Sequence, residues 1–203
     1  MGKTNLQGMQ EEMVKRLGEE QGTRVGKAMA QEYGCLCSDV SEYPKDFVRH
    51  LHNNIFPVVA TFRVLQKEGR TREEAAKIAN DAFLELMKQP RDMIQKMCKI
   101  PGVYRLMPFL WKKLMPKLFP ESAGFRFRNY PTDSKRVKFD MTECPYYKAC
   151  QKLDCLEVAE TFCTTDDVCY SAMHANLFWN RTKTIARGGD FCDFDIIVRK
   201  PED

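Results

Sequence analysis

Apolar side chains recur at helical spacing through the first part of the chain. Between residues 8 and 33 they fall about three or four positions apart, which predicts a helix that breaks near Gly18 to Gly22. A second helical pattern runs from about Pro44 to Gly69. Pro57 lies inside it and should bend the helix, because proline cannot donate a backbone hydrogen bond.

A third helix has a clear start signal in the sequence. Thr71 and Glu74 are spaced for a capping box, in which the threonine hydroxyl accepts from the amide three residues on. The glutamate carboxylate accepts in return from the amide of the capping residue. We expect this helix to continue to Pro90.

Residues 101–120 combine four basic residues and four aromatics with no acidic residue. This composition fits a segment that lies on an anionic membrane surface. It also fits a kinked pair of short helices that pack on the core while the lysine stems cover apolar surface. We favour the second interpretation, because prolines interrupt the segment at Pro101, Pro108, Pro116 and Pro120.

After Pro120 the period of the pattern changes to two. Residues 124–130 and 136–142 alternate apolar with polar side chains and are separated by turn residues, which predicts a β-hairpin. Residues 177–187 and 191–199 alternate in the same way. We expect these to form a second hairpin with a tight turn at Gly188-Gly189.

These elements together predict the α+β class. The two hairpins should form a four-stranded antiparallel sheet, and two helices over about 143–153 and 155–174 should cross one of its faces. We divide the chain into a helical region, 1–120, and an α+β region, 121–203, and expect them to form one integrated globular unit.

Composition narrows the class of protein. With 43% hydrophobic and 30% charged residues, the 203-residue chain can bury a core, which excludes wholesale disorder. The longest apolar run, Ile55 to Val64, is shorter than the roughly 20 residues of a membrane span. Basic residues are interleaved with acidic ones, unlike the clustered patch of a nucleic-acid-binding protein. The first 20 residues lack a signal-peptide core, so we expect a cytoplasmic protein.

The chain has nine cysteines, which we expect to be free thiols in a reducing compartment. Six of them follow residue 140, and their spacing matches no zinc-finger or zinc-ribbon pattern. Nothing in the sequence requires a cofactor. A metal ion held by Cys144, Cys163 and Cys192 from separate elements stays open as an alternative. We interpret Cys150, Cys155 and Cys169 as small buried hydrophobic residues.

Two thiols have neighbours typical of a helix start. Cys144 lies between Thr142, a good N-cap, and Pro145, which is favoured in a first helical turn. Amides at that end of a helix should lower the pKa of its thiol. Cys163 stands just before residues that can cap the next helix, and Asp166 is either a plain cap or a functional carboxylate.

In the second predicted hairpin, strand geometry places the neighbours Cys192 and Asp193 on opposite faces of the sheet. A tight turn at Gly188-Gly189 would place Thr184 opposite Asp193. Consecutive residues of a strand point to opposite faces, so Cys192 and Asp193 cannot enter one pocket without a bulge. Cys192 shares its face with apolar residues and should lie on the core side.

Three blocks of sequence resemble a known family. They are Phe139 to Tyr146 (FDMTECPY), Phe162-Cys163 with Asp166 three residues on, and Arg181 to Phe194 with the pattern R-T-x-T-x-A-x-G-x-D-x-C-D-F. Together they resemble the L-2-amino-thiazoline-4-carboxylic acid hydrolase family over about residues 45–199, and the last block is the most specific.

The resemblance implies a hydrolase that opens a 2-aminothiazoline ring to N-carbamoyl-cysteine. Water must add to the amidine-like carbon, after which sulfur leaves, so the site needs a general base, an acid and a cation for the substrate carboxylate. For catalysis, the candidates are Asp166 or Asp193 as base and Cys144, Cys163 or Cys192 as acid or covalent nucleophile.

The same block supplies candidates for binding a small-molecule substrate. Arg181 could hold the carboxylate in a bidentate pair, with Thr184 and Asp190 beside it, although a cross-strand ion pair is an equal alternative for Arg181. Two other classes of function compete with the enzyme. One is a non-catalytic, cysteine-rich sensor module that binds a metal or small ligand, and the other is a scaffolding domain whose cysteines are only structural.

Overall fold

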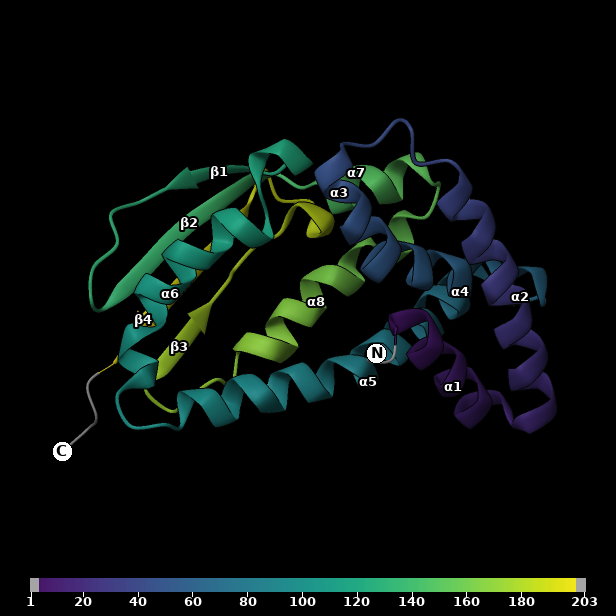
Figure 1. Ribbon diagram of the computed structural model, residues 1–203, viewed down its shortest axis with the longest axis horizontal. Helices are drawn as coiled ribbons and strands as arrows, with labels where there is room; N and C mark the ends of the chain where they lie inside the picture. Colours follow the sequence, from purple (N-terminus) through teal and green to yellow (C-terminus); the bar gives the residue numbers. More distant parts are fainter. Residues whose placement is uncertain (1–3, 200–203) are drawn as a thin grey trace. The chain divides into compact units, whose positions relative to one another are not determined.

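The computed structural model describes residues 4–199, and its helices and strands are labelled in Figure 1. The chain divides into two compact units. One holds Met1–Leu86 and Ala149–Thr161, and the other holds Met87–Lys148 and Phe162–Asp203.

The first unit begins with two helices that meet at a glycine. α1 (Asn5–Leu17) and α2 (Glu19–Ser38) are joined by Gly18, whose φ of 84° favours glycine, and the predicted break is confirmed. Gly22 allows the helices to pack closely. A Cβ atom there would lie 2.3 Å from the Cα of Val14, so the contact requires the absence of a side chain.

The predicted helix from Pro44 to Gly69 is also present, with a local defect. α3 (Lys45–His50) passes into a π-helical turn, η1 (Leu51–Ile55), and then into α4 (Phe56–Lys67). The widened turn ends at Ile55, two residues before Pro57, whose ring would clash with the carbonyl group four residues earlier in an ordinary helix. The expected bend therefore takes the form of a π turn.

α5 (Arg72–Cys98) starts where the capping box predicts. The Thr71 amide donates to a carboxylate oxygen of Glu74 at 3.1 Å, and the Glu74 amide donates to the Thr71 hydroxyl at 3.2 Å. The predicted end at Pro90 is wrong, because the helix continues through it. One proline costs a helix about 3 kcal/mol, and buried side chains on both sides, Phe83 and Cys98, keep each half packed.

In the second unit, residues 101–120 form one helix instead of the predicted pair. α6 (Val103–Leu118) contains Pro108 and Pro116, while the other two prolines lie outside its ends. Its buried face carries Tyr104, Met107 and Trp111. Figure 1 shows α6 lying across the sheet, where it packs on strands β2 and β4. Packing along one whole face stabilises the helix despite its prolines.

The sheet has four antiparallel strands in the order β1-β2-β4-β3, which confirms the α+β class. Their bounds are β1 (Arg126–Asn129), β2 (Arg136–Glu143), β3 (Leu177–Asn180) and β4 (Cys192–Val198). A short 3-10 turn, η2 (Glu121–Ala123), precedes β1. In the central pair Phe139 faces Phe194, and their rings stack 4.8 Å apart. Trp179 of β3 contacts Phe194 on the same face, with ring centroids 5.6 Å apart.

The predicted tight turn at Gly188-Gly189 is wrong. β3 ends at Asn180, and the connection to β4 includes a 3-10 turn, η4 (Ile185–Arg187). The chain leaves the sheet because the Asp193 carboxylate accepts hydrogen bonds from the amides of Thr182, at 2.9 Å, and Lys183, at 2.7 Å. Thr184 therefore caps η4 instead of facing Asp193 across a strand pair.

Between the hairpins lie the two predicted helices, α7 (Pro145–Lys152) and α8 (Ala159–Tyr170), separated by a 3-10 turn, η3 (Leu156–Val158). η3 and α8 both fall within the predicted helix over 155–174, but α8 runs through the helix start that we expected just after Cys163. Cys163 and Asp166 consequently lie inside α8, and Asp166 is not its cap.

Candidate functional site

Three chain segments of the second unit bring the candidate residues together. They are the start of α7, the part of α8 after Phe162, and the stretch from the end of β3 to the start of β4. The members of this thiol–carboxylate cluster are Cys144, Cys163, Asp166, Asp167, Arg181, Thr184 and Cys192.

Arg181 is the cation at the centre of the cluster. Its side chain is only 1% exposed and pairs with Asp166 at 3.1 Å and with Asp167 at 2.6 Å. It also donates to the Cys163 carbonyl oxygen at 2.5 Å. The guanidinium lies 5.4 Å from the ring centre of Phe194, a favourable cation–π distance.

These contacts limit what Arg181 can do. Both terminal nitrogens already have acceptors, while the buried Nε has no partner among the described residues. A bidentate pair with a substrate carboxylate would have to displace an existing ion pair. The geometry therefore favours Arg181 as a fixed positive charge that orders the two aspartates.

Asp167 is a site residue that our reading of the sequence did not single out. Its carboxylate accepts from the Trp179 indole at 3.0 Å and pairs with Arg181 and, at 3.5 Å, with Arg187. The only signal in the sequence is its place beside Asp166. The sequence around Asp166 and Asp167 does not indicate which of the two carboxylates accepts from the buried indole of Trp179.

The Asp166 carboxyl has an unusual pKa. Burial raises it to about 7, although the charge of Arg181 and a hydrogen bond from it act in the opposite direction. Asp167 adds to the increase, because a second negative charge beside the first disfavours ionisation. The side chain still keeps 34% of its surface exposed, so water can reach the carboxyl group.

Cys163 lies one helical turn before Asp166 on α8, so their side chains share one side of the helix. Burial raises the pKa of the Cys163 thiol. A hydrogen bond from the buried Thr184 hydroxyl and the charges of Arg181 and Arg187 lower it, but they do not offset the burial. Thr184 therefore links the η4 turn to this thiol.

Cys192 opens β4 and lies on the core side, as the strand pattern predicts. Its sulfur accepts a hydrogen bond from the amide of Ile185 at 3.3 Å. Burial raises the pKa of this thiol to about 11, and the neighbouring Cys163 contributes to the increase. At 3% exposure, Cys192 is nearly closed to solvent.

Cys144 is itself the cap of α7, because its carbonyl oxygen accepts the first helical hydrogen bond, from Lys148. Amides of Tyr146 and Tyr147 hydrogen-bond its sulfur, as expected at a helix start. The predicted lowering of its pKa is wrong, since burial outweighs these amides and raises the pKa to about 12. Electrostatic interaction with Cys163 and Cys192 adds to the increase, which indicates that the three thiols are near one another.

Two sequence candidates stay outside the cluster. The Asp193 carboxylate bonds the Thr182 hydroxyl at 2.6 Å as well as the two loop amides, and these hydrogen bonds lower its pKa. Asp193 thus fastens the loop, on the face opposite Cys192. Asp190 is exposed beyond η4.

The remaining thiols behave as expected. All nine cysteines are free, and Cys150, Cys155 and Cys169 are buried. Within residues 4–199, no group of three or more His, Cys, Asp or Glu side chains is arranged to hold a metal ion.

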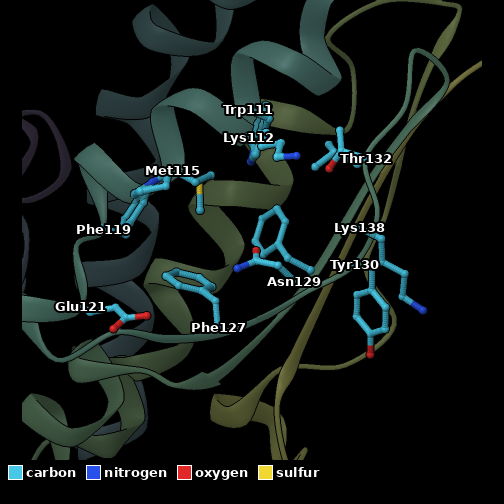
Figure 2. A pocket seen from close by; sticks show the side chains of 13 residues that line it. Trp111, Lys112, Met115, Phe119, Glu121, Phe127, Asn129, Tyr130, Thr132 and Lys138 are labelled. Atoms are coloured by element: carbon cyan, nitrogen blue, oxygen red, sulfur yellow. The ribbon is translucent and has the colours of Figure 1, made fainter.

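A cavity of about 270 Å³ lies in the same unit, between α6 and the β1–β2 hairpin. Figure 2 shows Met115 and Phe127 among its walls. Its thirteen lining residues include none of the candidate catalytic residues. Trp111 also lines it, and the buried indole Nε1 has no partner in the described part of the chain. Phe139 belongs both to this wall and to the aromatic stack below Arg181.

Comparison with known proteins identifies a family. A family model described as L-2-amino-thiazoline-4-carboxylic acid hydrolase matches residues 48–196. No curated protein matches the chain. Among solved structures, the chain is similar to the unliganded Fe(II) H-NOX protein from K. algicida, with 10% identity, 97% of this chain and 95% of that chain covered, and a TM-score of 0.35. A point mutant of that protein gives 10% identity, 98% coverage of both chains and a TM-score of 0.33.

Proposed function

The chain belongs to the L-2-amino-thiazoline-4-carboxylic acid hydrolase family, and on that basis we propose that its thiol–carboxylate cluster opens the ring of this acid, or of a related small cyclic amidine, to N-carbamoyl-cysteine. The observation that carries the proposal is the position of Asp166, whose partly exposed carboxyl group lies beside Arg181 and one turn from Cys163. All these residues fall within the matched range.

Asp166 acts as the general base toward water. A base works best when its pKa lies near the working pH, and burial brings the pKa of Asp166 to about 7. A large part of the carboxylate is therefore ionised at neutral pH, while its proton affinity stays well above that of an ordinary aspartate. Its exposed edge lets water and a small substrate approach.

Cys163 acts as the acid toward the departing sulfur. The pKa of its thiol is raised, so the group carries its proton at neutral pH and can donate it to the departing sulfur. Cys163 is partly accessible, whereas Cys192 is nearly closed to solvent. Cys144 and Cys192 then serve as protonated neighbours that keep the environment of Cys163 low in negative charge.

Arg187 is better placed than Arg181 to meet the substrate carboxylate. Its side chain is 41% exposed, and it lies 3.5 Å from Asp167 at the rim of the cluster. Its charge also acts on the Cys163 thiol, so a carboxylate bound there would place the ring beside the proposed acid. Arg181, which is buried, holds the Asp166 carboxylate in position through its hydrogen bond.

The bonds and protons of the ring opening balance with one water molecule. Asp166 takes a proton as the water oxygen bonds the amidine carbon, and this proton passes to the ring nitrogen. The carbon–sulfur bond then breaks, and the departing sulfur takes the proton of Cys163. The remaining hydroxyl becomes the carbonyl of the carbamoyl group, and its proton restores the Cys163 thiol.

A direct test is to incubate the purified protein with L-2-amino-thiazoline-4-carboxylate and to measure the new thiol. The protein has nine thiols of its own, so it should be removed by filtration before the thiol reagent is added. Mass analysis should find a product heavier than the substrate by one water. Asp166→Asn should slow product formation by about 100-fold or more, since it removes the base.

Asp39→Asn is the matched control, because it makes the same chemical change at an exposed aspartate that belongs to the other unit of the chain. It should leave turnover within about twofold of the unmodified protein, as expected for a residue that plays no part in the chemistry. No new thiol from the unmodified protein would overturn the proposed substrate. An undiminished rate for Asp166→Asn would overturn the assignment of the base.

A further inference from the structure

α6 has a second face that the sheet does not cover. Its inner face packs on the sheet, but Leu106, Phe109 and Leu114 keep 54%, 49% and 47% of their surface exposed. Large apolar side chains seldom gather on the surface of a protein that has no partner there. We call the surface formed by these three residues together with Arg105, Lys113 and Lys117 the outer α6 face.

The charges on this surface all have one sign. Arg105, Lys113 and Lys117 are exposed, and from Met93 to Pro120 the chain has six basic residues and no acidic one. In a helix, residues three or four apart share a face, which places Lys113 and Lys117 among the exposed apolar side chains. Within residues 4–199, neither lysine has an acidic partner in the structure.

We infer that the outer α6 face binds the surface of an anionic lipid bilayer. Leucine and phenylalanine side chains would enter the boundary between headgroups and acyl chains, while the lysines would meet phosphate and carboxylate groups above them. The absence of acidic residues matters here, because a negative charge on this face would repel such a surface.

Other occupants fit the face less well. A second copy of the chain would bring these cations against the same cations, which costs energy at a closely packed interface. A nucleic acid would neutralise the lysines but would leave Leu106 and Phe109 without an apolar surface to cover them. A zwitterionic bilayer would accept the apolar side chains without using the charge.

The geometry fits a helix that lies flat on the bilayer. No helix within residues 4–199 is long and apolar enough to cross a membrane. α6 has sixteen residues with the sheet packed along one side, so only its outer side chains can enter lipid. Binding would therefore be peripheral and reversible, and would depend on salt.

Vesicle sedimentation tests this inference with the full chain. The protein should pellet with phosphatidylcholine vesicles that contain about 30 mol% phosphatidylserine, and much less with phosphatidylcholine alone. Each lysine near an anionic surface contributes about fivefold to binding, so K113A/K117A should weaken the partition roughly 30-fold. L106S/F109S should weaken it about 10-fold or more, because it removes the apolar anchor. Raising NaCl from about 0.1 to about 0.5 M should have a similar effect to the lysine changes.

Two matched controls separate a local effect from a general one. K27A/K45A removes the same charge from exposed lysines elsewhere, and L156S/F178S replaces apolar residues that are 43% and 40% exposed. Both should bind vesicles like the unmodified protein. Thermal unfolding of each variant should show that all of them remain folded.

Several outcomes would overturn the inference. Equal pelleting with both kinds of vesicle would show that charge plays no part in binding. Control variants that lose as much binding as the α6 variants would show that binding does not depend on the outer α6 face. No pelleting, combined with a concentration-dependent dimer that L106S/F109S abolishes, would identify a second copy as the occupant. No pelleting, combined with salt-sensitive retardation of a DNA or RNA fragment, would identify a nucleic acid.

Discussion

Replacing Arg181 by methionine should destabilise the protein strongly, and the loss should depend on pH. Methionine keeps an apolar stem against Trp179 and Phe194, but it removes the charge that pairs with Asp166 and Asp167. It also leaves the Cys163 carbonyl without its donor. The perturbation therefore isolates the buried cation from the packing around it.

The size of the effect follows from burial. Removing one partner of a buried ion pair typically costs about 3–5 kcal/mol. Arg181 is 1% exposed, but the two aspartates keep 34% and 32% of their side-chain surface exposed, so water can partly solvate them once the cation is gone. We expect the lower end, about 3 kcal/mol, or a fall in Tm of roughly 6–12 °C for a chain of this length.

The pKa of Asp166 determines how the stability loss of Arg181→Met should change with pH. The folded-state pKa of Asp166 is about 7, above the ordinary value for aspartate, so the folded state loses stability as the pH rises through 7. Arg181 opposes this increase, and without it the pKa of Asp166 should rise further. At pH 5 the carboxyl is protonated in both proteins, so the difference between them should be smaller at pH 5 than at pH 8.

Urea unfolding at both pH values, followed by circular dichroism, measures the difference. Arg187→Met is the control, since it removes the same charge from a side chain that is 41% exposed and should cost less than about 1 kcal/mol. A loss below about 1 kcal/mol for Arg181→Met, or an equal loss at pH 5 and pH 8, would refute the importance that we give to the buried pair.

Three further predictions concern single groups. Hydrolysis should accelerate with pH up to about 7 and then level off as Asp166 ionises, and a rate that falls over this range would contradict its role as base. Maleimide at pH 7, followed by peptide mass analysis, should label the exposed Cys35 well before Cys192, whose thiol pKa is raised to about 11; early labelling of Cys192 would contradict its burial. Gly22→Ala should cost about 1–3 kcal/mol in urea unfolding because the added methyl group meets the α1 backbone, whereas Gly34→Ala, with open space around it, should cost no stability.

Local patterns were sufficient for most elements of the fold. The alternation of apolar and polar residues identified the strands that contain Phe139 and Phe194. The capping box at Thr71 located the start of α5. These signals depend on neighbours in the sequence, which is why they could be recognised without the structure. The family resemblance added the blocks that meet in the cluster.

The failures share a physical cause, which is that tertiary contacts outweighed local preference. Pro90 predicts a helix end, yet α5 passes through it. The amides at the start of α7 predict an acidic thiol at Cys144, but burial of the sulfur outweighs them, and the distant segments that carry Cys163 and Cys192 add to the increase in its pKa. The excursion after Asn180 depends on Asp193 binding two loop amides, and no pattern in the sequence distinguishes that from a strand.

The position of β4 has a consequence for the way the sheet assembles. β4 is the last strand in chain order, yet it lies at the centre, between β2 and β3. The β1–β2 hairpin can form while the ribosome is still working, but β3 has no strand to pair with until β4 has been made. Contacts such as that between Arg136 and Ile197 close long loops, which makes them slow to form. A premature stop codon before residue 192 would thus remove the middle of the sheet and leave two separated pieces exposed to aggregation.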